Sequence, residues 1–310
     1  MTEKEVQERM RDCTLCPRRC HADRLSGGRG FCGQSAQIRA ARAALHFWEE
    51  PCISGESGSG TVFFSGCSLQ CVFCQNHEIA MGKAGQGISG RRLAEIFLEL
   101  QEKGAANINL VTAAHFLPQV CLALERAGEE GLSVPVVYNS SGYEEIDSLK
   151  MLEGLADIYL PDLKYHSPRL SGLYSQAPDY FEKASAAIGE MVRQAGPPVL
   201  DPETGLMKKG VIVRHLLLPG QAGDSKRILR YLRDMYGDDI YVSIMNQYTP
   251  MKQITESAQW GTADLSRPVT AREYERVLDF ADKIGIRQGY RQEGETAAES
   301  FIPAFDGEGL

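Results

Sequence analysis

The sequence predicts an α/β protein whose main part is an open, partial (β/α)6 barrel. From residue 61 onward, six short runs of strand composition alternate with about six helical patterns, the order of a parallel α/β array. All runs but the first carry few alternating polar residues, as expected for strands buried on both faces. Right-handed crossovers would curl this array into a partial barrel. The expected strands cover residues 61–65, 107–112, 135–139, 157–160, 211–218 and 240–245.

The helical patterns between these strands have recognisable starts and stops. Ser89 can cap a helix over 90–103, whose apolar residues follow one stripe and which Gly104 can end. Pro118 can open a helix over 119–127, because the first helical turn tolerates proline. Four further helices are expected over 143–155, 180–194, 225–236 and 271–284. Parallel α/β folds bind ligands at the C-terminal ends of their strands, so we expect the chemistry at that edge.

The chain divides into three expected segments. Residues 1–60 do not fit the barrel pattern and are expected to form a small cysteine-rich, metal-binding element. Residues 61–292 form the barrel, and residues 293–310 form a C-terminal tail. The length of 310 residues allows one large domain or two ordinary ones, with ample core in either case.

The net charge and the hydropathy of the chain argue against nucleic acid binding and against a membrane protein. The net charge of −8 disfavours a nucleic acid partner. No apolar run approaches the roughly 18–20 residues that span a bilayer, and the charged N-terminus lacks a secretory segment. We therefore expect a cytoplasmic protein with no membrane partner. Nine cysteines in such a protein indicate metal or redox chemistry rather than disulfides.

Three cysteines follow the first expected strand directly. Cys67, Cys71 and Cys74 have the spacing C-x3-C-x2-C. A [4Fe–4S] cluster normally takes four thiolates, so three would leave one iron without a protein ligand. An open metal position is where a small molecule can be bound and activated. The spacing therefore favours a catalytic cluster over the alternative of buried or zinc-binding cysteines.

Four other cysteines form a second group within residues 1–60. Cys13, Cys16, Cys20 and Cys32 have the spacing C-x2-C-x3-C-x11-C. Four thiolates complete a tetrahedral zinc or iron site, or a fully ligated auxiliary [4Fe–4S] cluster, and the spacing does not separate these. Such a site could pass electrons, or it could be a metal staple for a segment poor in apolar side chains. Both interpretations stay open.

The cysteine motif after the first strand resembles the signature of the radical S-adenosylmethionine (SAM) superfamily, whose barrels are partial (β/α)6 barrels. Runs over 58–67, 136–143, 157–165 and 213–220 are similar to uncharacterised relatives of the pyruvate formate-lyase activating proteins, the activases of glycyl radical enzymes. The likeness covers nearly the whole chain. It implies that SAM binds the open iron and that a donor such as flavodoxin or ferredoxin supplies an electron. The resulting 5′-deoxyadenosyl radical would abstract hydrogen from a substrate, such as a glycyl radical enzyme, another protein or a peptide.

The resemblance also implies roles for five barrel residues. Asp162 and Lys164 match an Asp-Leu-Lys that contributes to SAM binding and to a cation site in the activases. Their opposite charges suit a zwitterionic ligand, although a salt-bridged barrel rim is the alternative. Asn139 and Ser140 stand where those activases carry Asp-Thr, and Arg214 matches an arginine that approaches the SAM carboxylate. His215 should point away from the site by strand alternation.

Three more residues complete the expected SAM site. Phe73 would pack beside the cluster and near the adenine, with a simple core aromatic as the alternative. Where the superfamily often has Gly-Gly-Glu after its second strand, this chain has Thr112 and His115 nearby as substitutes. His115 could instead be an acid or base toward the substrate, or a hydrogen-bonded loop residue.

Two rival functions predict different sites. A non-catalytic electron carrier or zinc-based interaction module would have two saturated metal sites and would not bind SAM. An ordinary SAM methyltransferase would need a glycine-rich motif after the first strand, where this chain has cysteines.

Overall fold

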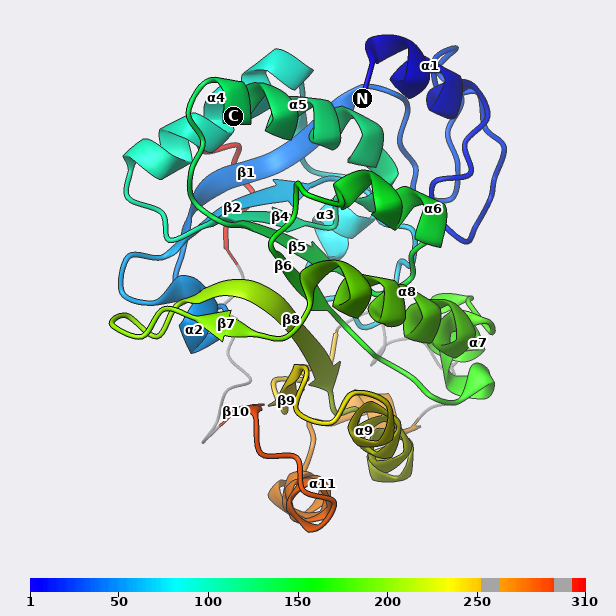
Figure 1. The fold of residues 1–310 in the computed structure, drawn as a ribbon. Helices are drawn as coiled ribbons and strands as arrows, with labels where there is room; N and C mark the ends of the chain where they lie inside the picture. Colours follow the sequence, from blue (N-terminus) through cyan, green and yellow to red (C-terminus); the bar gives the residue numbers. More distant parts are fainter. Residues whose placement is uncertain (252–262, 293–302) are drawn as a thin grey trace.

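The computed structural model describes residues 1–251, 263–292 and 303–310. Its strands are β1 (Ile38–His46), β2 (Ser59–Phe64), β3 (Gln86–Ile88), β4 (Ile108–Val111), β5 (Val136–Ser140), β6 (Ile158–Pro161), β7 (Val199–Leu200), β8 (Met207–Leu216), β9 (Tyr241–Met245) and β10 (Gly289–Arg291). In the described residues they form one sheet in the order β10-β9-β8-β6-β5-β4-β2-β1-β3, with β7 attached to β8 (Figure 1).

The strands from β2 to β10 along this order pair in parallel, and the sheet does not close. All six strands expected from the sequence are present, as β2, β4, β5, β6, β8 and β9, with ends shifted by a few residues. Every residue of β4, β5 and β6 is buried, which explains their uninterrupted apolar character. The predicted open α/β barrel is therefore confirmed.

The main helices are α1 (Glu3–Arg11), α2 (Pro51–Ser54), α3 (His77–Ala80), α4 (Gly90–Glu102), α5 (Leu117–Glu129), α6 (Ile146–Leu149), α7 (Pro168–Ser175), α8 (Tyr180–Ala195), α9 (Ala222–Tyr236) and α11 (Ala271–Lys283). Ser89 caps α4 as predicted, because its side chain accepts a hydrogen bond from the Arg92 N–H. The helix expected over 143–155 is shorter. Glu145 has extended backbone angles, so α6 begins only at Ile146 and continues as a 3₁₀ turn to Leu152.

The N-terminal segment joins the sheet rather than standing apart from it. β1 pairs antiparallel with β2, so the expected boundary at residue 60 does not coincide with a break in the sheet. The described end of the tail also packs here, since the Ala43 N–H donates to the Glu308 carbonyl at 2.8 Å. Arg42 forms an ion pair with Asp306 at 2.9 Å. No helix in the described part of the chain is long and apolar enough to cross a membrane.

The curved sheet has two differently used faces. Helices α4, α5 and α8 lie on one face in Figure 1, and Tyr138 of β5 belongs to the large core cluster on that side. Successive residues of a strand point to opposite faces, so the neighbouring Asn139 points to the inner face. Asn139 and Arg214 line a cavity there, which makes the inner face the place for a ligand.

Candidate active site

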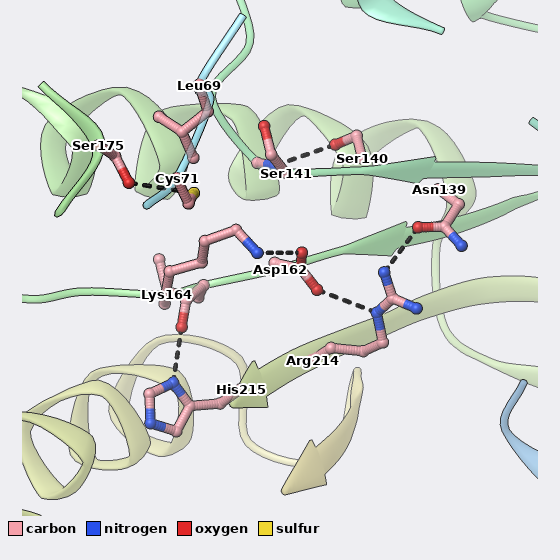
Figure 2. Close-up of polar contacts among 12 residues, drawn as sticks. Leu69, Cys71, Asn139, Ser140, Ser141, Asp162, Lys164, Ser175, Arg214 and His215 are labelled. Carbon is pink, nitrogen blue, oxygen red and sulfur yellow. Dashed lines mark hydrogen bonds and ion pairs between the residues drawn. The ribbon is translucent and has the colours of Figure 1, made fainter. Parts of the chain in front are cut away.

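The three-cysteine loop leaves β2 at the C-terminal edge of the sheet, as predicted. Cys71 is buried, whereas Cys67 and Cys74 are partly exposed. The Leu69 N–H donates to the Cys67 Sγ at 3.3 Å. The Ser175 hydroxyl donates to the Cys71 Sγ at 3.0 Å, as Figure 2 shows. Hydrogen bonds to sulfur are typical of the protein surroundings of metal-bound thiolates.

Two of these thiols are held protonated by the protein alone. Loss of hydration at these two sulfurs, together with the neighbouring Cys71 sulfur, raises the pKa of Cys67 to about 11 and of Cys74 to about 12. The Lys164 ammonium opposes this rise in both pKa values. Metal ligation requires thiolates, so metal binding at this loop would release protons.

A row of charged side chains runs from the cysteine loop into the barrel. The Lys164 ammonium lies 2.5 Å from one oxygen of Asp162, and the Arg214 Nε donates to the other oxygen at 3.0 Å. Arg214 also donates to the Asn139 side-chain oxygen at 2.6 Å. Figure 2 shows these four side chains lying one after another in space, with Cys71 beside Lys164. Four predicted residues from two strands, β5 and β8, and from the chain after β6 thus meet in one place.

Asp162 stays ionised in this row. Burial alone would raise its pKa, but the neighbouring Lys164 and Arg214 outweigh burial and lower it. The salt-bridged rim considered from the sequence is therefore present, and it is compatible with holding a zwitterion, because a ligand carboxylate and ammonium can join the same row.

Glu49 completes the row, and sequence reasoning did not find it. Its carboxylate accepts hydrogen bonds from Asn109 and Asn139, each at 3.2 Å, and from Arg214 at 3.1 Å. It thereby brings a carboxylate next to Asn139, at the place where the activases resembled by this chain have an aspartate. No motif around Glu49 indicates that it belongs to the site. It follows β1, in the segment that was expected to stand apart from the barrel.

A cavity of about 450 Å³ opens beside this row. That volume lies within the range of small-molecule sites. Among its lining residues are Glu49, Glu50, Gln75, Asn139 and Arg214. Burial raises the pKa of Glu50, and its Oε2 has no hydrogen-bond partner among the described residues. The cavity therefore reaches from Gln75, just after the three-cysteine loop, to Asn139 and Arg214 in the barrel.

Two other residues predicted to bind the cofactor, Phe73 and Ser140, lie outside the cavity. Phe73 is buried and packs edge-to-face against Tyr165, Tyr174 and Tyr248, each with ring centroids 6.1–6.2 Å apart, in the manner of a core aromatic. Ser140 accepts from the Gly142 N–H at 3.1 Å and shapes the turn after β5. Neither residue lines the cavity.

The two histidines serve local structure. His115 is buried, and its Nε2 lies 2.7 Å from the Ser65 carbonyl oxygen. Burial and Arg24 lower the pKa of His115 to about 3, so it is neutral at physiological pH. His215 contacts the Leu163 carbonyl at 2.7 Å and the Ser225 hydroxyl at 2.8 Å, away from the row. Its predicted structural orientation is confirmed.

Thr112 holds a strained backbone at the C-terminal edge of β4. Its φ is 61°, in the left-handed region that a β-branched residue rarely adopts. Its N–H donates to the Asn139 carbonyl at 2.9 Å, which ties the strained turn to the charged row. A glycine would fit this conformation freely. The strain thus lies where the superfamily resembled by this chain often has glycines.

Because of this strain, glycine should be more stable than alanine at position 112, the opposite of the usual order within a strand. Thr112→Gly should be more stable than Thr112→Ala by about 1 kcal/mol, because both lose the same side chain and only alanine keeps the left-handed strain. Urea unfolding would measure the difference. At Thr61, which lies within β2, the ordinary order should hold, with alanine more stable than glycine. The same order at both positions would contradict the strain.

One buried arginine lies close to two of the four N-terminal cysteines, Cys13 and Cys32. Cys13, Cys16 and Cys32 are buried, and Cys20 is exposed. A Cβ at Gly30 would lie 2.3 Å from the Cys20 Sγ, so Gly30 packs closely against that sulfur. Arg24 is 1% exposed, donates to the Cys13 Sγ at 3.8 Å and to the Ser35 carbonyl at 2.7 Å, and has no carboxylate partner among the described residues.

The N-terminal element touches the three-cysteine loop directly. A Cβ at Gly66, which has a φ of 89°, would lie 2.7 Å from the Cys32 carbonyl oxygen. The Gln70 side chain donates to the Phe31 carbonyl at 2.8 Å. The two cysteine groups therefore share a backbone interface. In residues 1–251, 263–292 and 303–310, no three His, Cys, Asp or Glu side chains are gathered closely enough for a single metal ion.

Comparison with known proteins finds similarities around the cysteine loop and along much of the chain. Residues 53–156 match the family described as 4Fe-4S single cluster domain, which supports the predicted cluster. The uncharacterized protein MJ0674 of Methanocaldococcus jannaschii is 26% identical over 89% of this chain and 76% of its own length. A radical SAM methyltransferase from Sphaerobacter thermophilus is 18% identical, with a TM-score of 0.49 over 77% of this chain and 69% of that chain. Streptococcus suis SuiB bound to its precursor peptide SuiA is 11% identical, with a TM-score of 0.46 over 74% of this chain and 46% of that chain.

Proposed function

We propose that this protein is a radical SAM enzyme whose [4Fe–4S] cluster is held by Cys67, Cys71 and Cys74. The observation that carries this proposal is the three-cysteine loop at the C-terminal edge of β2, next to the charged row. Three thiolates leave one iron of the cluster for a small molecule. When bound, the cluster would supply the electron for reductive cleavage of SAM to a 5′-deoxyadenosyl radical.

The charged row would hold the amino acid part of SAM. Arg214 presents a guanidinium that suits a carboxylate, and Asp162 presents a carboxylate that suits an ammonium. Glu49 holds Arg214 in place from the opposite side at 3.1 Å. The adjoining cavity would receive the substrate group that loses hydrogen. The burial of these side chains keeps water away from the reacting atoms.

The substrate follows from the sequence resemblance. We include in the proposal that hydrogen is taken from a glycyl radical enzyme or another protein or peptide, with flavodoxin or ferredoxin as the electron donor. Incubation of the reduced enzyme and SAM with a candidate glycyl radical enzyme should give a glycyl radical signal in electron paramagnetic resonance (EPR) spectra. Formation of 5′-deoxyadenosine without that signal for any candidate would point to a different substrate.

The test of the activity is anaerobic reconstitution followed by metal analysis and a SAM assay. The sample is quantified for iron, sulfide and zinc, then incubated with dithionite and SAM, and 5′-deoxyadenosine is measured. Four irons with one zinc and product would support a radical SAM enzyme with a zinc staple. Eight irons with product would support an auxiliary N-terminal cluster. A full cluster without SAM cleavage would favour the electron carrier.

For the N-terminal cysteines we propose a second metal site, either zinc or an auxiliary iron–sulfur cluster. Buried Arg24 supports it, because a buried cation needs an anionic partner and the nearby Cys13 sulfur can supply one once ionised. A site of four thiolates carries net negative charge with either metal. Arg24 would then be its counter-charge.

Removing this charge should weaken metal binding. Arg24→Met is expected to lower metal affinity at the four-cysteine site by about 10–100-fold, the usual effect of losing a partner of a metal ligand. The measurement is metal retained against a chelator, in a background where Cys67, Cys71 and Cys74 are alanine. The control is Arg29→Met, since Arg29 is exposed. Equal retention in both variants would contradict the role of Arg24.

A further inference from the structure

We propose, on the premise that the three-cysteine loop carries the [4Fe–4S] cluster, that Ser175 is a positioning residue that sets the cluster's reduction potential. Ser175 ends α7, a helix that lies outside the charged row and the cavity. Its hydroxyl donates to the Cys71 Sγ at 3.0 Å (Figure 2). Nothing in the proposed binding of SAM accounts for this contact.

The hydroxyl belongs to a buried relay with a fixed direction. The Tyr165 hydroxyl lies 2.7 Å from the Ser175 Oγ, and both residues are 1% exposed. A serine hydroxyl has one proton, and an iron-bound thiolate has none to donate. Once Cys71 binds iron, Ser175 must therefore donate to the sulfur, and Tyr165 must donate to Ser175. The two hydroxyls point their positive ends toward the cluster.

The backbone of α7 docks on the same loop. The Val72 N–H donates to the Tyr174 carbonyl at 2.9 Å, directly beside the contact between Ser175 and Cys71. The last carbonyls of a helix carry partial negative charge and need donors from outside the helix. Placed against an anionic cluster, this helix end would be unfavourable unless a cation neutralised it.

Arg18 of the N-terminal element provides that cation. Its guanidinium donates to the Ser175 carbonyl at 2.7 Å, to the Gln176 carbonyl, and to the Ser68 carbonyl of the cysteine loop at 2.9 Å. Its plane also stacks 3.8 Å from the Phe31 ring centroid. One side chain therefore joins the N-terminal element, the end of α7 and the cysteine loop, and keeps Ser175 within reach of Cys71.

A hydrogen bond to cluster sulfur favours the reduced state. Reduction adds negative charge to the cluster, and a donor to sulfur stabilises that charge. Loss of the Ser175 hydroxyl should therefore move the midpoint potential to more negative values. At a fixed reductant potential, a smaller fraction of the cluster would then be reduced.

The first experiment is a redox titration followed by EPR, on reconstituted Ser175→Ala without SAM. The signal of the three-cysteine cluster is recognised by its absence from a parallel sample of Cys67→Ala. Iron and sulfide content should match the wild type, and the midpoint potential should be more negative. The matched control is Ser171→Ala, because Ser171 lies on the same helix, is 1% exposed, and donates to the Pro168 carbonyl instead. Its potential should equal that of the wild type.

A second variant decides the matter if Ser175→Ala does not retain its cluster. Tyr165→Phe keeps Ser175 and removes the donor behind it, so a smaller shift of the same sign is expected. If Ser175→Ala keeps its iron, an unshifted midpoint potential in that variant would overturn the role of Ser175. If it loses iron, an unshifted potential in Tyr165→Phe would do so.

The same samples separate this role from the proposed activity. A shifted potential in a protein whose wild type makes no 5′-deoxyadenosine would support the role of Ser175 and reject the radical SAM function. If the wild type makes 5′-deoxyadenosine but the variants show no shift in midpoint potential, the radical SAM function is supported and the role of Ser175 is rejected.

Discussion

Replacement of Cys71 by alanine is expected to reduce 5′-deoxyadenosine formation to background while the protein stays folded. Cys71 supplies one of three thiolates, and its sulfur is the one that accepts the buried Ser175 hydroxyl. Residues that merely hydrogen-bond to a metal ligand change affinity or activity by about 10–100-fold, so loss of the ligand itself should exceed about 100-fold. Product is measured after anaerobic reconstitution, alongside iron and sulfide content.

The matched control for this variant is Cys121→Ala. Cys121 is also buried, but it lies in α5, where its sulfur contacts the Met151 carbonyl at 3.4 Å. This variant should keep its iron and its SAM cleavage rate within about twofold, because it touches neither cysteine group. Circular dichroism should show native folds for both variants. Full activity in Cys71→Ala would defeat the assignment of the cluster.

The sequence carried enough information for the parallel strands but not for β1. Buried parallel strands have continuous apolar runs, which is why β4, β5 and β6 were predicted nearly residue by residue. β1 has the sequence IRAARAALH, which is rich in alanine and arginine. These residues favour helices, and β1 is a strand only because β2 and β3 pair with it on either side. That pairing is tertiary information.

The residues of the candidate site likewise fall into those that the sequence predicted and those that only the structure shows. Asp162, Lys164 and Arg214 were predicted because each stands in a run that resembles the activases of glycyl radical enzymes. Glu49 lies 165 residues from Arg214 along the chain, and no local pattern announces their contact. Arg18, likewise, reaches Ser175 over 157 residues. The residues that hold the predicted site in place come from the segment that the sequence showed as separate.

The second large effect is expected at Asp162. Asp162→Asn should destabilise the protein by about 3 kcal/mol, because removal of one partner leaves buried charge uncompensated. Lys164 and Arg214 would then face each other without the carboxylate between them; their side chains are 17% and 15% exposed. Urea unfolding measures the loss. Asp306→Asn is the control, since the Asp306 side chain is 54% exposed in its pair with Arg42 and its loss should cost about 1 kcal/mol or less.

The pH dependence of that loss identifies its cause. The pKa of Asp162 is lowered in the folded protein, because Lys164 and Arg214 outweigh the effect of burial. An unfolded aspartate has a pKa of about 3.9. A group with a lowered folded pKa stabilises the protein fully above its unfolded pKa, and this contribution disappears as the pH falls through the folded pKa. The gap in unfolding free energy between wild type and Asp162→Asn should therefore be constant from about pH 5 to 8 and close below about pH 4. A gap that widens in acid would mean that the carboxyl acts in its protonated form, as a hydrogen-bond donor, and not as the anion that organises Lys164 and Arg214 for a zwitterionic ligand.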